Sequence, residues 1–391
     1  MGIIKGLNWR NIFIFLFFIV FPFGQITRLS FNLFGTSIPL LPIDVIVGCS
    51  AIYTLINKTR KPKIFGYIVT FLWFLIFSFI LSIFVFKTVF LVYGLFYLLR
   101  LAVYFLFLVY IWDFVRQNLK NKELLQDSLL GISVMSAVFG WIQFFMIPDI
   151  KALFVYGWDI HLFRLIGTFL DPAFLGLIIV FGLLISIFRT VQKKNINNIG
   201  TIIFLLLSLA FTYSRASYLA LFAGLLVIAW YNKFVKWAVI FILVFTALLF
   251  LLPTSRNHSI ELLRSFSALA RIDNYKTTLL IFAKSPVFGV GYNNMCIAYQ
   301  KFIGIQPFSS HACSGSDSSL LMVLTTTGVI GFIIFANMIY KIGISLKNNS
   351  RFKMLTSCFA ALLVHSLFSN SLFYPWIFGY MIILLAVSVT D

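Results

Sequence analysis

The chain has 391 residues, of which 61% are hydrophobic and only 10% are charged, whereas a soluble domain carries about 25% charged residues. This composition excludes a soluble globular protein, because no soluble fold could bury so much apolar surface. The formal net charge of +19 would suit nucleic acid, but the basic residues lie in short clusters between apolar runs. We therefore expect a lipid bilayer as the partner and no nucleic acid.

The apolar runs predict an all-α polytopic membrane protein with about 12 transmembrane helices. A bilayer core requires roughly 20 apolar residues per helix, and these runs lack the period-two alternation of barrel strands. A pair of spans is short enough to contain a broken or re-entrant helix, and the whole chain, residues 1–391, should form a single transmembrane domain. The spans are predicted at residues 11–28, 35–57, 65–86, 89–113, 126–147, 172–188, 199–213, 216–231, 237–253, 318–340, 354–373 and 375–390; the short pair is 199–213 and 216–231.

The positions of Lys and Arg predict that both termini are cytoplasmic. With the N-terminus inside, 18 of the 30 Lys and Arg residues fall in inner tails and loops, as the positive-inside rule requires. These inner loops have only about five to a dozen residues. They contain no phosphate-binding loop, dinucleotide fingerprint or metal-ligand spacing of His or Cys, so an ATP-driven pump or a cytosolic nucleotide-sugar enzyme would need a partner subunit.

Two longer segments, residues 148–171 and 254–317, are predicted on the outer side, where function should concentrate. The second has about 64 residues and precedes the last three spans. Its apolar residues recur near helical spacing, so we interpret it as a large extracytoplasmic loop with one or two helices at the membrane interface; the alternative is a plug that packs on the bundle. The apolar residues of this pattern are Ile260, Leu263, Phe266, Leu269 and Ile272.

This outer loop is basic, which departs from the positive-inside rule. A cluster of guanidinium groups beside a membrane suits phosphate or diphosphate, because the planar fork forms bidentate charge-assisted hydrogen bonds. Attraction to lipid head groups is the alternative. The basic residues of the loop are Arg256, Arg264, Arg271, Lys276, Lys284 and Lys301, against the acidic residues Glu261, Asp273 and Asp317.

Two further arginines and two cysteines have noteworthy positions. Arg100 lies within the apolar run 90–113, where a charge costs at least about 2.5 kcal/mol and is usually paired or functional. Arg215 lies at the outer end of two predicted spans, where snorkelling would also explain it.

Cys296 and Cys313 share the outer loop, in a compartment that permits a disulfide; two reduced thiols are the alternative.

Four segments together resemble a known family. They are Arg164–Pro172 entering a span, the Ser214-Arg215-Ala216 turn, the stretch from Arg271 to Tyr292, and Ser316–Ser319 with the later Gly328–Gly331. Their order and spacing, with the large outer loop before the last three spans, resemble the bacterial O-antigen ligase and O-antigen polymerase superfamily of lipid-linked glycan transferases. The likeness covers most of residues 90–390.

The resemblance implies a glycosyltransferase C-type helical architecture and a glycan donor linked to a polyprenyl diphosphate such as undecaprenyl diphosphate. It also implies an outer-face reaction without a metal or nucleotide cofactor. Such a protein needs only to neutralise the charge of the diphosphate and remove a proton from the acceptor hydroxyl. Arg215 and Arg271 match the family's basic positions and are assigned to the diphosphate. Arg164 and Arg100 are further candidates for that role, with helix packing or ion pairing as the alternative.

The catalytic base is expected just before the last three spans. In the ligases of this family a His and a polar residue are followed by nine residues and then Gly-x-x-Gly. Counting back from Gly328 gives Asp317 and Ser318, and an acidic residue in the first position is more like the polymerase branch. Asp317 is therefore the predicted base and His311 the second candidate, although either could simply orient sugar hydroxyls.

The sequence thus predicts a metal-independent glycosyltransferase of the cytoplasmic (inner) membrane. It would polymerise polyprenyl-diphosphate-linked repeat units of O-antigen or a related surface polysaccharide, with a chain-length regulator protein as a candidate partner. A ligase that transfers glycan to lipid A core or another acceptor is the alternative within the superfamily. A flippase or exporter is the alternative from another class, although residues 1–195 and 196–391 show no sign of the paired repeats typical of transporters.

Overall fold

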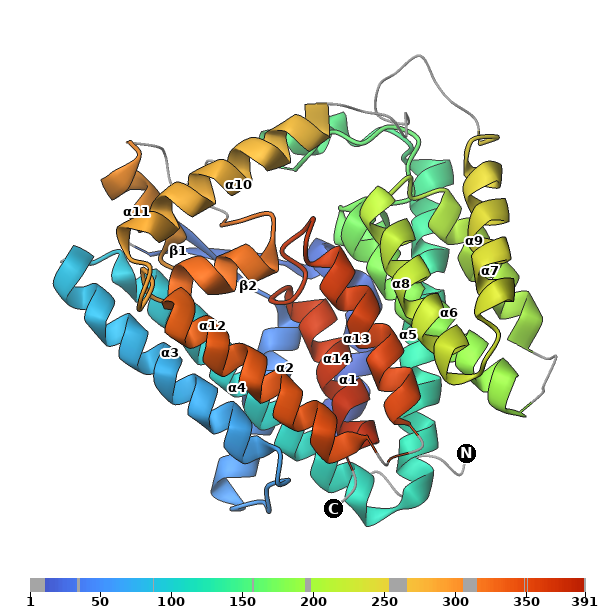
Figure 1. Cartoon of the computed structure of the whole chain (residues 1–391), viewed down its shortest axis with the longest axis horizontal. Coiled ribbons are helices and arrows are strands. Elements are labelled where there is room, and N and C mark those ends of the chain that lie inside the picture. Colours follow the sequence, from blue (N-terminus) through green and yellow to red (C-terminus); the bar gives the residue numbers. More distant parts are fainter. Residues whose placement is uncertain are drawn as a thin grey trace.

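The computed structural model is a bundle of helices with one small hairpin (Figure 1). The described part of the chain has 14 α-helices and one two-stranded antiparallel sheet. The predicted all-α class therefore holds except for this hairpin. The residues that the structure describes are 11–33, 36–86, 88–156, 158–193, 198–252, 266–304, 315–347, 349 and 351–389.

The elements follow one another with short connections. The α-helices are α1 (Ile12–Val20), α2 (Pro42–Ile56), α3 (Phe65–Phe86), α4 (Leu91–Gln117), α5 (Leu119–Met146), α6 (Pro172–Lys193), α7 (Ile199–Ala210), α8 (Arg215–Tyr231), α9 (Val235–Leu249), α10 (Phe266–Lys284), α11 (Met295–Phe302), α12 (Ser319–Leu346), α13 (Phe352–His365) and α14 (Pro375–Ser388). The strands are β1 (Leu29–Leu33) and β2 (Thr36–Leu40), and the 3-10 helices are η3 (Phe21–Thr27), η4 (Lys151–Tyr156) and η5 (Gly167–Phe169).

Each of the twelve predicted spans overlaps one apolar helix. Five of these helices, α3, α4, α5, α6 and α12, are long and apolar enough to cross a membrane by length and composition. The other seven are shorter apolar helices of 10–17 residues, with α1 counted together with η3 as Ile12–Thr27. The chain is therefore a multi-pass membrane protein, and the crossing of the bilayer by all twelve helices stays a prediction.

The second predicted span, residues 35–57, begins too early. Strand β2 occupies its first part and pairs with β1 in the register Leu29↔Leu40 and Phe31↔Ile38. The helix that follows starts only at Pro42, because Pro suits the first helical position and the Asp44 carboxylate accepts a hydrogen bond from the Leu41 N–H at 3.2 Å. The local start signal thus prevails over the continuous apolar composition.

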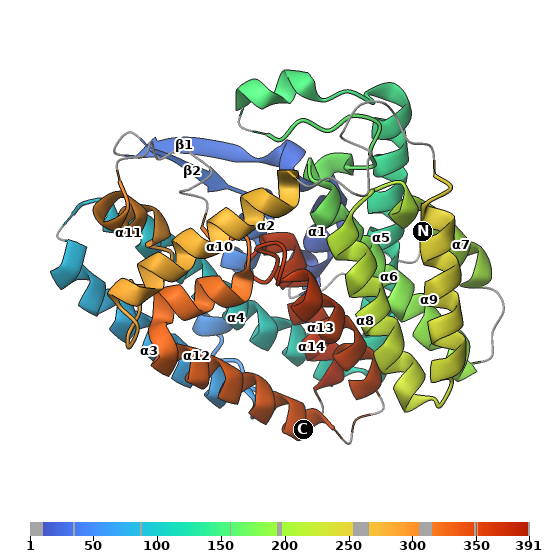
Figure 2. The same cartoon turned by 45° about the horizontal axis from the view of Figure 1, so that its top comes forward.

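Helix α10 lies across one end of the bundle. Figures 1 and 2 show it running over the end at which α8 and α12 begin and α13 ends. Both α10 and α11 lie within residues 254–317, and the extracytoplasmic, interfacial place of this segment stays a prediction. This arrangement brings a basic helix of the loop over the polar ends of three bundle helices.

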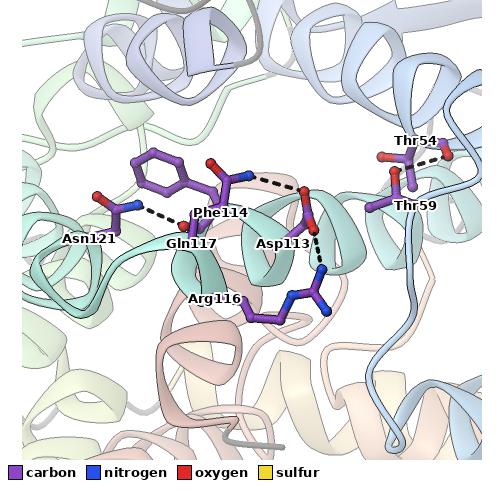
Figure 3. Close-up of polar contacts among 7 residues, drawn as sticks. All are labelled: Thr54, Thr59, Asp113, Phe114, Arg116, Gln117 and Asn121. Carbon is purple, nitrogen blue, oxygen red and sulfur yellow. Dashed lines mark hydrogen bonds and ion pairs between the residues drawn. The ribbon is translucent and has the colours of Figure 1, made fainter. Parts of the chain in front are cut away.

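At the α4–α5 junction, polar side chains satisfy one another locally (Figure 3). The Asp113 carboxylate accepts hydrogen bonds from Arg116 at 3.3 Å and from Gln117 at 3.2 Å. The Asn121 side chain donates to the Phe114 carbonyl at 2.7 Å. The Asn121 amide therefore satisfies one of the terminal carbonyls of α4.

Candidate functional site

Helix α12 is broken near its middle, and the segment after α10 packs into the break. Gly328 has φ +68° inside the helix. The carbonyls of Thr325 and Thr326 accept hydrogen bonds from the N–H groups of Val290 and Gly291, both at 3.0 Å. The backbone of the loop thus takes the place of the helical partners that α12 loses at the break.

Two glycines make this close approach of backbones possible. Gly289 has φ +73°, and a Cβ added there would lie 2.3 Å from the Thr326 carbonyl carbon. A Cβ added at Gly328 would lie 2.2 Å from the Val287 carbonyl oxygen. Two segments of the family resemblance, the one with Gly289 and the one with Gly328, therefore contact each other in the structure. Only a residue without a side chain fits at these two positions.

Replacing Gly328 by Ala should destabilise the fold by about 2–6 kcal/mol. The backbone there lies in a region that essentially only glycine adopts, which costs other residues about 1–3 kcal/mol, and forcing a Cβ against backbone costs a further 1–3 kcal/mol or so. Gly343→Ala in the same helix is the control, since an added Cβ meets nothing within 4 Å there. Thermal unfolding in detergent gives the melting temperature of each variant. Equal melting temperatures would contradict backbone strain at the break in α12.

Arg271 is carried by α10, which is tethered to the helices below it. The Tyr275 hydroxyl donates to the Leu367 carbonyl just after α13. The Thr325 hydroxyl of α12 donates to the Thr278 carbonyl of α10 at 3.4 Å. These tethers fix the turn of α10 that contains Arg271 over the beginning of α12 and the end of α13.

Arg215 is the first residue of α8, just before the predicted span 216–231. The Ser214 hydroxyl caps this helix by accepting a hydrogen bond from the Ser217 N–H at 3.4 Å. Burial lowers the pKa of the Arg215 guanidinium, and the positive charge of Arg271 lowers it further. The two arginines assigned to the diphosphate therefore lie within electrostatic range of each other, although 56 positions separate them in the chain.

Asp317 lies directly before the Ser318 cap of α12. Burial raises the pKa of the Tyr275 phenol; the positive charge of Arg271 opposes this rise and the negative charge of Asp317 adds to it. Tyr275 is thus in electrostatic range of both residues. We refer to Arg215, Arg271 and Asp317 as the Arg–Asp site.

The Arg–Asp site suits a multiply charged anion. Two guanidinium groups repel each other unless negative charge lies between them, and each presents a planar fork that matches phosphate oxygens. In the described part of the chain, no three His, Cys, Asp or Glu side chains gather in a way that could hold a metal ion. The chemistry of these side chains suits a diphosphate at the arginines and a proton at the carboxylate, and both roles stay predictions.

Arg164 is buried and holds the turn before Arg215. Its guanidinium donates to the carbonyls of Thr212 at 3.0 Å and Tyr213 at 3.1 Å, and it contacts His161 at 3.4 Å. Tyr213 has φ +50°, so this turn is strained and needs such support. The geometry favours the packing alternative for Arg164, which then acts on the site by placing Arg215.

Arg100 is paired elsewhere in the bundle. Its guanidinium forms a salt bridge with Asp44 of α2 at 2.9 Å and donates to the Pro39 carbonyl of β2 at 2.6 Å. It also lies over the Tyr97 ring, 5.0 Å from the centroid. These contacts favour the pairing alternative, in which Arg100 joins α4 to α2 and the hairpin.

Some predicted residues lie outside the described part of the chain. These include His311, the second candidate base, and the loop arginines Arg256 and Arg264. Cys296 is disulfide-bonded, which is one of the two alternatives left open by the sequence, whereas Cys49 and Cys358 are free. Cys313, its predicted partner, also lies outside the described residues.

His365 is a residue of this region that the sequence did not reveal. It is buried at the end of α13, with Nε2 3.4 Å from the Ser217 hydroxyl and Nδ1 in contact with the Ser371 hydroxyl. It also interacts electrostatically with Arg271. His365 lies inside the predicted span 354–373. The polar residues around it in this apolar segment are the signal that could have indicated a functional position.

His365→Ala should lower the stability of the protein by about 1–3 kcal/mol, because it removes one hydrogen-bond partner from each of the buried hydroxyls of Ser217 and Ser371 and leaves a cavity at a buried site. Ser366→Ala is a matched control on the adjacent residue. The Ser366 hydroxyl is buried without a hydrogen-bond partner in the described structure, so its removal should be neutral or slightly stabilising. Apparent melting temperatures in detergent test both changes, and a larger loss in the Ser366 variant would contradict this network.

Comparison with known proteins agrees with the geometry. Residues 200–336 match the family model described as O-antigen ligase. The matched segment runs from α7 into α12 past the break and contains Arg215, Arg271 and Asp317. No curated protein matches the chain. The family match over residues 200–336 supports the resemblance to the O-antigen ligase and O-antigen polymerase superfamily seen in the sequence.

Proposed function

We propose that the protein is a glycosyltransferase that takes its glycan from a polyprenyl diphosphate. The observation that carries this proposal is that Arg215 of α8 and Arg271 of α10 lie within electrostatic range of each other, while Arg271 and Asp317 both lie within electrostatic range of Tyr275. Two guanidinium groups can neutralise a diphosphate as it departs, and a carboxylate can take up the proton of the acceptor. The family match over residues 200–336 supports the same class of reaction.

In the proposed reaction, an acceptor hydroxyl attacks the anomeric carbon of the lipid-linked glycan. The bond from this carbon to the diphosphate oxygen breaks while the bond to the acceptor oxygen forms. Arg215 and Arg271 stabilise the negative charge that collects on the leaving diphosphate, and the hydroxyl proton moves to the Asp317 carboxylate. The activated donor supplies the driving force, so no nucleotide is required.

We further propose that the acceptor is a second lipid-linked repeat unit, which makes the protein a polymerase. The support is Asp317, an acidic residue where the resemblance places the His of the ligases. A ligase is the second candidate, because the matching family model is described as O-antigen ligase. The two reactions share the donor and differ only in the acceptor.

The proposed reaction takes place at the outer face of the cytoplasmic membrane. The Lys and Arg distribution supports cytoplasmic termini, and with that topology the loop 254–317, with α10 and α11, is extracytoplasmic. The remaining chain, within 1–391, then forms one transmembrane domain with the C-type helical architecture. A chain-length regulator protein is a candidate partner at this face.

Purified protein incubated with lipid-diphosphate-linked repeat units tests the proposal, with the products separated on a gel. A ladder of glycans that remain attached to the lipid is the expected result. Transfer to added lipid A core without a ladder would identify the ligase reaction instead. Transport of the lipid-linked glycan in vesicles, with neither product formed, would overturn the transferase assignment.

A further inference from the structure

Asn274 of α10 holds the chain segment that carries Asp317. Its side-chain oxygen accepts hydrogen bonds from the Asp317 N–H at 2.9 Å and from the Ser316 hydroxyl at 3.5 Å. Its side-chain nitrogen donates to the Gly315 carbonyl at 3.3 Å. One amide thus binds three consecutive residues of the segment that enters α12.

Asn274 also lies on the same helix as Arg271. The two residues are three positions apart, so they are neighbours on one face of α10. On its other side, Asp317 is followed by Ser318, whose hydroxyl donates to the Ser366 carbonyl at 3.2 Å. The backbone at Asp317 is therefore fixed between α10 and the end of α13, and Asn274 supplies the α10 half of this support.

This geometry links the two parts of the Arg–Asp site. The position of Asp317 relative to Arg271 depends in part on a side chain of the helix that carries Arg271, because Asn274 joins α10 directly to the Asp317 backbone. A reacting group displaced by about 1 Å can lose about a hundredfold in rate. A purely structural asparagine would alter stability alone, whereas a residue that sets this spacing would alter the chemical step.

We infer that Asn274 is a positioning residue of the glycosyl transfer, which fixes the base Asp317 against the diphosphate-binding Arg271. The inference rests on the proposed function. Asn274 itself touches neither donor nor acceptor in this scheme. Removing its side chain should therefore slow catalysis while leaving donor binding to the two arginines nearly intact.

The first test does not depend on activity. Hydrogen exchange at the Asp317 amide is measured by mass spectrometry in the purified full chain, for wild type and Asn274→Ala. Loss of the acceptor oxygen should accelerate exchange at this amide, because exchange reports local opening. Asp273→Asn is the control, since this neighbouring carboxylate is exposed and forms an ion pair with the exposed Lys276. Unchanged exchange in Asn274→Ala would overturn the inference.

The second test measures transfer kinetics of the same variants. We expect Asn274→Ala to lower kcat by about 10- to 100-fold with KM for the lipid-linked donor within about twofold of wild type, and Asp273→Asn to leave both unchanged. A kcat of Asn274→Ala equal to that of wild type would overturn the inference about Asn274 and leave the proposed function intact. Failure of the wild type to transfer glycan would instead remove the proposed function on which the inference rests.

Asn274→Asp keeps the two accepted hydrogen bonds and places a second carboxylate beside Asp317. Like charges favour protonation, and the base acts only when ionised, so the acid limb of the rate profile should move to higher pH. The other titratable groups around the segment are Arg271, Asp273, Tyr275 and Lys276 of α10, Arg215 of α8 and His365 of α13, and this variant leaves all of them in place. An unmoved profile in this folded variant would contradict the inference.

Discussion

Asp317→Asn is expected to lower kcat by about 10²- to 10⁴-fold, the usual contribution of a general base. Asparagine has nearly the same shape and retains the backbone contact of residue 317 with Asn274, so the fold should persist. The amide cannot accept the proton of the acceptor hydroxyl. Initial rates of glycan transfer, measured with saturating lipid-linked donor, test this expectation.

The pH dependence gives an independent check on the same residue. A general base must be ionised to accept a proton, so wild-type activity should fall as the pH falls and Asp317 becomes protonated. The residual activity of Asp317→Asn should lack this acid limb. His311→Ala provides the comparison, because His311 is the second candidate base; a larger loss of kcat in that variant than in Asp317→Asn would transfer the role to the histidine.

The helices were predictable from the sequence because burial in lipid requires long uncharged runs. Every predicted span overlaps a helix, and the ends of several are set by local signals such as Pro42 in α2. The hairpin of β1 and β2 was missed because each strand has only five residues, with β1 falling between two predicted spans and β2 at the start of the second. Composition alone cannot distinguish a paired strand from a helical turn in such a run.

Within the site, the charged residues could be predicted and their supports could not. Arg215 stands out as a charge near apolar segments, and the family resemblance assigns Arg271 and Asp317, whereas Asn274 and His365 are ordinary polar residues whose roles depend on what folding places beside them. Arg100 and Arg164 are also charges near apolar segments. Their contacts with Asp44 and with the Thr212 carbonyl arise from tertiary structure, so the sequence could not separate them from the arginines of the site.

Removing either arginine of the Arg–Asp site should reduce kcat/KM by about 10²- to 10³-fold, the typical effect of losing one donor to a developing negative charge. The variants are Arg215→Ala and Arg271→Ala. Lysine should restore only part of the activity at either position, because an ammonium keeps the charge but loses the bidentate fork. Lys284→Ala is the matched control, since Lys284 is an exposed cation in the last turn of the same helix as Arg271.

The double variant distinguishes a shared ligand from two separate effects. Residues that bind one group jointly give non-additive losses, so Arg215→Ala combined with Arg271→Ala should lose much less than the product of the two single losses. Independent head-group contacts would instead give losses that multiply and that Lys284→Ala partly reproduces. The proposed function rests on the two guanidinium groups lying within electrostatic range of each other. Losses that multiply in well-folded variants would therefore contradict the joint binding of a diphosphate.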